Sequence, residues 1–255
     1  MGSMTLYVEK NSIIHNIDPL TKLLYVFVSI AATYIVPAHE FVLLVAAFSL
    51  LLLVLGKVFV KILPIIAISI ILIISIIIVQ GMFHPDNETI LFSVGVITFY
   101  QEGLSYAALL TLRVINMLSA FGVLILTTKP DELIERLIKK GMSPKIGYVF
   151  LSVLQIIPQM RATMAKITDA QRSRGMETEG NLLVRLKAFF PLIGPVVLNS
   201  LNDTRERAIA LEMRGFNTKG KKTFLNESQE YPYRKVMQLL LAAGLIAAIM
   251  WRILL

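Results

Sequence analysis

Two stretches of the sequence end in the same pattern, Ala-x-x-x-Arg-Gly followed by a hydrophobic residue. The first occupies residues 170–176, and the second occupies residues 210–216, which is 40 positions further along the chain. Glycine suits the left-handed position just past a helix end, and a cation suits the negative end of the helix dipole. The pattern therefore predicts two long helices whose last turns carry Arg174 and Arg214.

An arginine held at a helix end can bind a carboxylate through two parallel hydrogen bonds, because its guanidinium is planar and presents its donors as a fixed fork. Arg174 and Arg214 are therefore candidates for two equivalent contacts with something outside the chain. The alternative is a pair of ordinary helix caps with solvated arginines. The two short motifs alone do not decide between these interpretations.

The sequence lacks the motifs of common catalytic and cofactor sites. It has no cysteine, and its three histidines, His15, His39 and His84, show no metal-ligand spacing. It contains no Gly-x-x-x-x-Gly-Lys-Ser/Thr phosphate loop, no His-Glu-x-x-His and no Gly-x-Ser-x-Gly. We therefore expect no enzymatic activity, no cofactor and no metal site.

The elements that must position the two arginines belong to a membrane protein. Hydrophobic residues make up 56% of the 255, and several apolar runs are long enough to span a bilayer. We expect an all-α fold: a polytopic helical membrane protein with about five transmembrane helices plus amphipathic helices on the cytoplasmic side. The expected spans are 20–36, 40–55, 58–79, 104–126 and 236–254. Residues 90–100 alternate too little to assign and are interpreted as a re-entrant or surface piece.

The positive charge is concentrated in one block. Nineteen of the 25 Lys and Arg residues lie within 129–235. The positive-inside rule then places this block and the N-terminus in the cytoplasm and the C-terminus outside. The chain has a net charge of +8. We expect its basic block to interact with anionic lipid headgroups of the bilayer rather than with nucleic acid.

Three amphipathic helices are expected within this block, at 130–140, 144–174 and 182–214, lying along the membrane surface. The predicted organisation is a membrane domain of four spans at 1–128, a cytoplasmic domain at 129–235, and a last transmembrane helix at 236–255.

Two of the charged residues near or inside the expected spans, Arg113 and Asp18, need a separate interpretation. An arginine inside a membrane is costly and often functional, so Arg113 keeps open a membrane insertase with a hydrophilic groove. We favour a structural role, in which Arg113 extends outward or pairs with Glu102 or a backbone carbonyl. Asp18 is expected to cap the first span or to position Lys22 one turn on.

Together these motifs resemble those of the transmembrane T component of energy-coupling factor (ECF) transporters, the CbiQ/EcfT family. Ser173-Arg174-Gly175 and Met213-Arg214-Gly215 are similar to its two X-Arg-X motifs, which are often Ala-Arg-Gly. Residues 14–23 resemble the family's opening His-x-Leu-Asp-Pro-Arg-x-Lys-Leu, with Leu20 where Arg is usual, and residues 127–133 also match.

The resemblance covers most of the chain and implies a non-catalytic subunit of a prokaryotic ABC transporter in the cell membrane. It implies two ATPase subunits as partners, together with a small membrane-embedded substrate-binding (S) subunit for vitamin or metal-ion uptake. The chain itself would bind no small-molecule substrate. The implied ATPase-docking residues are Ser173, Arg174, Gly175, Met213, Arg214 and Gly215. A membrane insertase or another self-contained membrane factor is the alternative. The substrate, and whether the two ATPases are identical, stay open.

Overall fold

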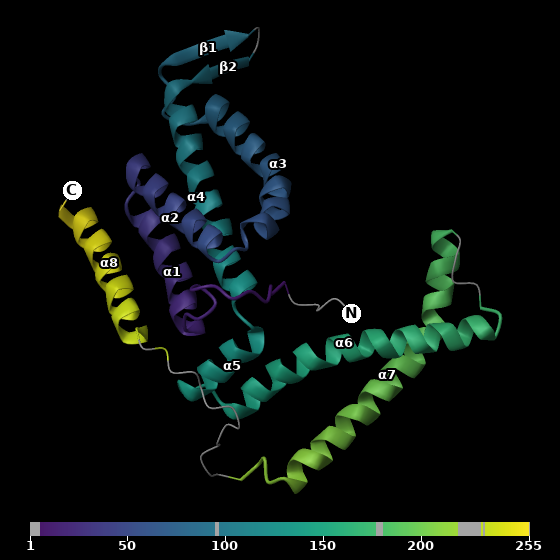
Figure 1. Cartoon of the computed structure of the whole chain (residues 1–255). Coiled ribbons are helices and arrows are strands. Elements are labelled where there is room, and N and C mark those ends of the chain that lie inside the picture. Colours follow the sequence, from purple (N-terminus) through teal and green to yellow (C-terminus); the bar gives the residue numbers. More distant parts are fainter. Residues whose placement is uncertain (1–5, 95–96, 177–180, 219–230, 232, 255) are drawn as a thin grey trace. The chain divides into compact units, whose positions relative to one another are not determined.

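The computed structural model describes residues 6–94, 97–176, 181–218, 231 and 233–254. It confirms the expected all-α membrane fold (Figure 1). The chain divides into two compact units, one formed by 1–137 with 228–255 and the other by 138–227. In chain order the elements are α1 (Pro19–Ile35), α2 (His39–Leu55), α3 (Phe59–Phe83), β1 (Ile90–Val94), β2 (Ile97–Tyr100), α4 (Gln101–Thr127), α5 (Pro130–Lys139), α6 (Pro144–Ser173), α7 (Leu182–Met213) and α8 (Arg234–Leu254).

Helix α4 is the centre of the first unit, because it packs against α1, α2 and α3, while α8 packs against α1. Small residues allow the close approach that packing between membrane helices requires. At Gly122 of α4, a Cβ atom would lie only 2.6 Å from the Cδ1 atom of Ile62 in α3. The largest cluster of buried side chains lies around this contact and comprises Ile14, Leu53, Val58, Ile62, Val123 and Leu126.

A network of buried polar side chains also joins α4 to α1 and α2. The Oδ1 atom of Asn116 in α4 accepts hydrogen bonds from Ser29 of α1 at 3.1 Å and from Ser49 of α2 at 2.6 Å. The hydroxyl of Tyr25 lies 2.6 Å from the Ser49 hydroxyl. In a membrane, hydrogen bonds of this kind hold helices together where apolar packing alone gives little preference.

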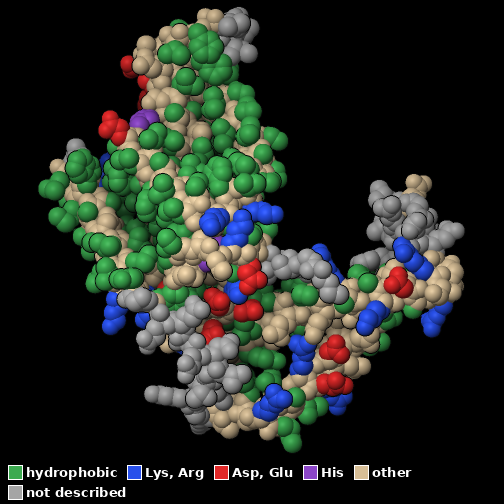
Figure 2. Space-filling model, viewed as in Figure 1, with side chains coloured by type: hydrophobic (Ala, Val, Ile, Leu, Met, Phe, Trp, Pro, Cys, Tyr) green, Lys and Arg blue, Asp and Glu red, His purple; other side chains and the backbone are tan. Residues whose placement is uncertain are grey.

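The first unit has the surface of a membrane protein. Three of the helices described are long and apolar enough to cross a bilayer, namely α3, α4 and α8. The apolar helices α1 and α2 have 17 residues each, the lower end of the usual spanning range of about 17–25 residues. On the face that Figure 2 shows, hydrophobic side chains cover much of the surface of the first unit.

The segment that the sequence left open forms a β-hairpin. Strands β1 and β2 pair antiparallel, with Ile90 opposite Tyr100 and Val94 opposite Ile97. The rings of Phe92 and Phe99 stack with their centroids 4.9 Å apart. Such cross-strand aromatic contacts stabilise a short hairpin, although neither strand is long enough for its alternation to stand out in the sequence.

The second unit consists mainly of α6 and α7, which pack against each other. Both helices continue through internal prolines, Pro158 in α6 and Pro191 and Pro195 in α7. Arg207 of α7 donates a hydrogen bond to the side-chain oxygen of Gln159 in α6. The unit thus presents two long helices that each end in one of the motifs identified from the sequence.

Candidate docking site at two helix ends

Helix α6 ends in a complete Schellman motif. Its last helical residue is Ser173, Arg174 is the C-cap, and Gly175 takes a φ of +87°. The amide of Gly175 donates to the carbonyl of Arg172 at 2.9 Å, and the amide of Met176 donates to the carbonyl of Gln171 at 3.1 Å. These two bonds satisfy carbonyls that the helix end would otherwise leave without partners.

Helix α7 ends in the same way. Arg214 is the C-cap and Gly215 has a φ of +71°. The amide of Gly215 donates to the carbonyl of Glu212 at 2.9 Å, and the amide of Phe216 donates to the carbonyl of Leu211 at 3.0 Å. The repeated sequence pattern therefore produces the same backbone geometry twice, and each arginine lies one position beyond the last helical residue.

Both arginines are exposed. Within the part of the chain that the structure describes, neither guanidinium has an ion-pair or hydrogen-bond partner. Two neighbours are exposed as well: Ser173, whose hydroxyl donates to the carbonyl of Asp169 at 3.0 Å, and Met213, which is 85% exposed. Each helix end thus presents a cation with its full set of donors, and the α7 end adds an apolar side chain.

The two helix ends are kept apart rather than brought together. Phe216, just after the α7 cap, packs against Tyr148 near the start of α6, with ring centroids 5.4 Å apart. The stretch of α6 from Tyr148 to Ser173 is about 40 Å long at a rise of about 1.5 Å per residue. Arg214 therefore lies near the start of α6 and Arg174 at its end, a spacing suited to two separate binding sites. The sequence did not predict the contact of Phe216 with Tyr148, because the two residues are far apart in the chain.

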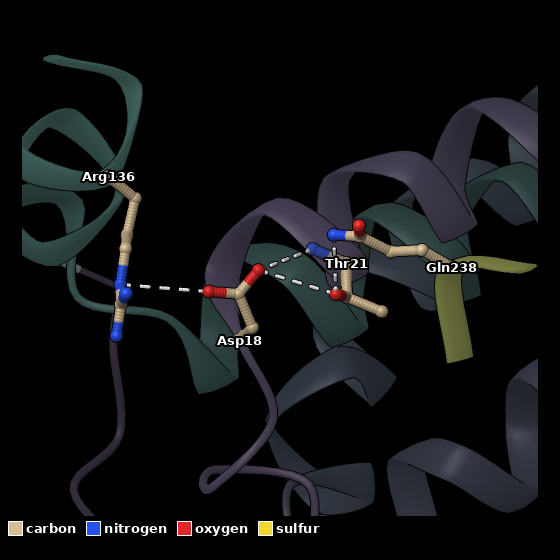
Figure 3. Close-up of polar contacts among 4 residues, drawn as sticks. All are labelled: Asp18, Thr21, Arg136 and Gln238. Carbon is tan, nitrogen blue, oxygen red and sulfur yellow. Dashed lines mark hydrogen bonds and ion pairs between the residues drawn. The ribbon is translucent and has the colours of Figure 1, made fainter. Parts of the chain in front are cut away.

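Asp18, whose contacts Figure 3 shows, has a structural role, and so has Lys22. Asp18 caps α1, since its Oδ2 atom accepts from both the amide and the hydroxyl of Thr21 at 3.3 Å, which confirms the first of the two expected roles. Lys22 instead donates to the carbonyl of Thr127 at 2.9 Å. The Oδ1 atom of Asp18 lies 3.6 Å from the Nε atom of Arg136, a partner that no local sequence pattern identifies.

Arg113 also has a structural partner. Its Nε atom donates to the carbonyl oxygen of Thr33 at 3.0 Å, and its guanidinium lies 4.7 Å from the centroid of the Tyr34 ring. The expected backbone-carbonyl partner is therefore present. Glu102 is not its partner, because that carboxylate accepts from Thr89 in the hairpin region. Among the described residues, no group of three or more His, Cys, Asp or Glu residues could hold a metal ion.

These features define a polytopic helical membrane protein whose distinctive site is a pair of arginine-capped helix ends. Residues 10–224 match the CbiQ family, described as cobalt transport protein. The chain belongs to this family, which confirms the resemblance read from the motifs. This membership removes the support for the insertase alternative, as does the structural pairing of Arg113.

Curated relatives carry the name energy-coupling factor transporter transmembrane protein EcfT. The protein from Streptococcus equi subsp. equi is 31% identical, with 82% of this chain and 81% of the relative covered. The Clostridium kluyveri protein is 29% identical, with 87% and 86% covered. The Bacillus subtilis protein is 27% identical, with 85% and 86% covered. The match therefore covers more than four fifths of each of these three relatives.

Proposed function

We propose that this chain is the coupling subunit of an ECF-type ABC transporter. It binds two ATPase subunits through Arg174 and Arg214, and it transmits their ATP-driven motion to a separate S subunit that captures a vitamin or a metal ion. The chain itself is non-catalytic, has no cofactor and binds no transported substrate. The observation that carries this proposal is the pair of matching helix ends, each with an exposed arginine.

The geometry supports docking to two partners for three reasons. The two backbone caps are alike, so both arginines leave their helices in equivalent surroundings. The arginines lie roughly 40 Å apart along α6, which suits binding to two separate sites, one on each partner, rather than to a single site. Each cap is a rigid hydrogen-bonded turn, so movement of an anchored tip moves the whole helix behind it.

The contact with the S subunit is assigned to the apolar side of the second unit. A row of side chains on α6 is hydrophobic and exposed at helical spacing, and α7 has a similar row. Such a surface suits a partner that is itself embedded in the membrane. The α6 row comprises Ile146, Val149, Phe150, Val153 and Ile157.

The proposal includes a topology. The N-terminus and the basic block at 129–235 are cytoplasmic, where ATPases are available, and the C-terminus is outside. Functionally, residues 1–128 form the membrane domain, residues 129–235 form the coupling domain, and residues 236–255 form the last transmembrane helix.

The test is replacement of the two arginines, followed by ATPase copurification and substrate uptake at equal membrane levels. Removing one partner of a desolvated charge pair costs about 2–5 kcal/mol, so Arg174→Ala or Arg214→Ala should weaken assembly by at least about tenfold. The double variant should abolish assembly. Lysine at either position should restore it only in part, because an ammonium lacks the planar fork.

Matched controls are Arg161→Ala in α6 and Arg205→Ala in α7, exposed arginines away from the helix ends. These changes should leave assembly within a few tenths of a kcal/mol, as is usual for exposed charges. If the double tip variant still binds both ATPases and still transports, the helix ends are ordinary caps and the proposal fails.

A further inference from the structure

Helix α8 leaves a cavity beside the core of the first unit. The cavity has a volume of about 220 Å³ and lies among α1, α2, α4 and α8. Its wall includes Ile17, Tyr25, Leu52, Val123 and Leu241. Because α8 packs against α1 but not closely against α2 or α4, the space between these helices is not filled by protein side chains.

The wall of this cavity is apolar. The three polar side chains that could disturb it are engaged elsewhere. Lys22 donates to the carbonyl of Thr127, the Tyr25 hydroxyl bonds to Ser49, and the Thr21 hydroxyl donates to Asp18. Among the described residues that line the cavity, no polar atom is exposed to its interior. Apolar cavities of about 150 Å³ stay dry and take up hydrocarbon. In a membrane protein the surrounding source of hydrocarbon is lipid.

A second cavity, of about 400 Å³, continues from the first at the level where α1 and α8 begin. Both cavities are lined by Ile17, Thr21 and Met237, so these three residues form the boundary between them. Gln238 of α8 donates to the hydroxyl of Thr21 at 3.2 Å, which fixes the two helix starts beside each other (Figure 3). The second cavity is thus a mouth where two membrane helices begin.

The surface of the mouth is mostly apolar, but its lining residues include polar side chains and a cation. Its lining includes Asn16, Tyr231, Tyr233 and Arg234. Within the described part of the chain, the Arg234 guanidinium has no ion-pair partner. Asp18 also lines the mouth, but its carboxylate is fully buried and paired with Arg136. Tyrosines and arginines are typical side chains at the level of lipid headgroups.

We propose that this pair of cavities is a binding site for one membrane phospholipid. An acyl chain occupies the apolar cavity, and the phosphate lies at the mouth against Arg234. Hydrocarbon space next to an unpaired cation matches the two ends of such a molecule and does not match a soluble metabolite. The lipid would fill the gap between α8 and the other helices and so belong to the packing of the first unit.

The test is native mass spectrometry of the full chain, purified in mild detergent and titrated with phosphatidylglycerol or with diacylglycerol of the same acyl chains. The wild type should hold one phosphatidylglycerol after washing, and it should bind diacylglycerol about fivefold more weakly, the effect of one cation at an anionic headgroup. Arg234→Gln should remove this difference between the two lipids. Met237→Trp, which places bulk at the boundary between the cavities, should lower binding of both.

Two controls on α8 separate this site from the general lipid shell. Leu239→Trp adds the same bulk at a side chain that is 70% exposed and outside the cavity, and Arg252→Gln removes a cation near the other end of the helix. Both should bind like the wild type. Equal binding by all four variants, no tightly held lipid in the folded wild type, or a copurifying protein that occupies α8 in place of lipid would each overturn the proposal.

Discussion

The carboxylate of Asp18 and the guanidinium of Arg136 lie 3.6 Å apart, between the Oδ1 and Nε atoms (Figure 3). Asp18 is fully buried and Arg136 is nearly so, with 13% of its side chain exposed. The pair ties the start of α1 to α5, the helix that precedes α6 and α7 in the chain. The ring of Tyr231 lies 5.0 Å from the guanidinium and adds a third segment to this junction.

We expect Asp18→Asn to destabilise the protein strongly. Asparagine keeps the cap of α1, because it is as good an N-cap residue as aspartate, so the change isolates the lost charge. Removing one member of a buried pair costs about 3–5 kcal/mol, since the buried charge of Arg136 is no longer offset by that of the carboxylate. Thermal unfolding in detergent is the measurement. Glu9→Gln, which removes an exposed partner of Lys129, is the control and should cost less than about 1 kcal/mol. Equal losses in the two variants would contradict the role of burial.

The glycines of the two caps provide a second prediction. Gly175→Ala and Gly215→Ala should each weaken their helix ends by about 1 kcal/mol, because a side chain is strained at positive φ. Hydrogen exchange of the amides of Met176 and Phe216 should accelerate accordingly. Gly244→Ala, inside α8 with open space around it, should cause no such loss. Unchanged exchange at both caps would show that the Schellman bonds do not hold these ends.

Local patterns in the sequence were sufficient for the helix ends and for the expected spans. The order Arg-Gly-hydrophobic specifies a Schellman cap through the chemistry of adjacent residues, and the structure forms that cap after both Arg174 and Arg214. The cap at Asp18 was predictable for the same reason, since it precedes Pro19 at the start of an apolar run.

Contacts between distant segments were not predictable from one sequence. Nothing near Asp18 points to Arg136, and nothing near Asn116 points to the hydroxyls of Ser29 and Ser49. Such pairs form only when the helices pack together. No local pattern in the sequence shows which helices will do so. The β-hairpin was missed because two strands of five and four residues are too short for a clear alternation of side chains.

Acid should destabilise the folded protein through His15. Burial lowers the pKa of this imidazole, the nearby charges of Lys22 and Lys10 lower it further, and the carbonyl of Val8 opposes them. Its unfolded value is about 6.5, so the unfolded chain takes up the proton first as the pH falls. The contribution of His15 to the free energy of unfolding is therefore fully present above about pH 6.5. It is lost as the pH falls through the pKa of His15 in the folded protein. His15→Gln should show a smaller loss of melting temperature between pH 7.5 and 5.5, and an unchanged slope would exclude His15.

The proposed topology can be tested by labelling single cysteines, because the chain has none of its own. Glu88 and Lys140 are both exposed in the structure and lie in segments assigned to opposite sides of the membrane. An impermeant maleimide added to intact cells should label Glu88→Cys and not Lys140→Cys, while both should react after the membrane is opened. The reverse pattern would overturn the orientation.

The apolar row on α6 gives the last prediction, which tests contact with the S subunit separately from contact with the ATPases. Val153 is 48% exposed within this row, so Val153→Glu introduces a charge at the proposed contact with little disturbance of the helix itself. Gln155→Glu introduces the same charge two residues away, at a position that is exposed and already polar. A charge buried in an apolar contact without a partner is strongly unfavourable. We therefore expect Val153→Glu to reduce copurification of the S subunit and substrate uptake by at least about tenfold, whereas ATPase binding and the Gln155→Glu control stay at wild-type levels. If S-subunit copurification is unchanged in Val153→Glu, this face of α6 is not the contact.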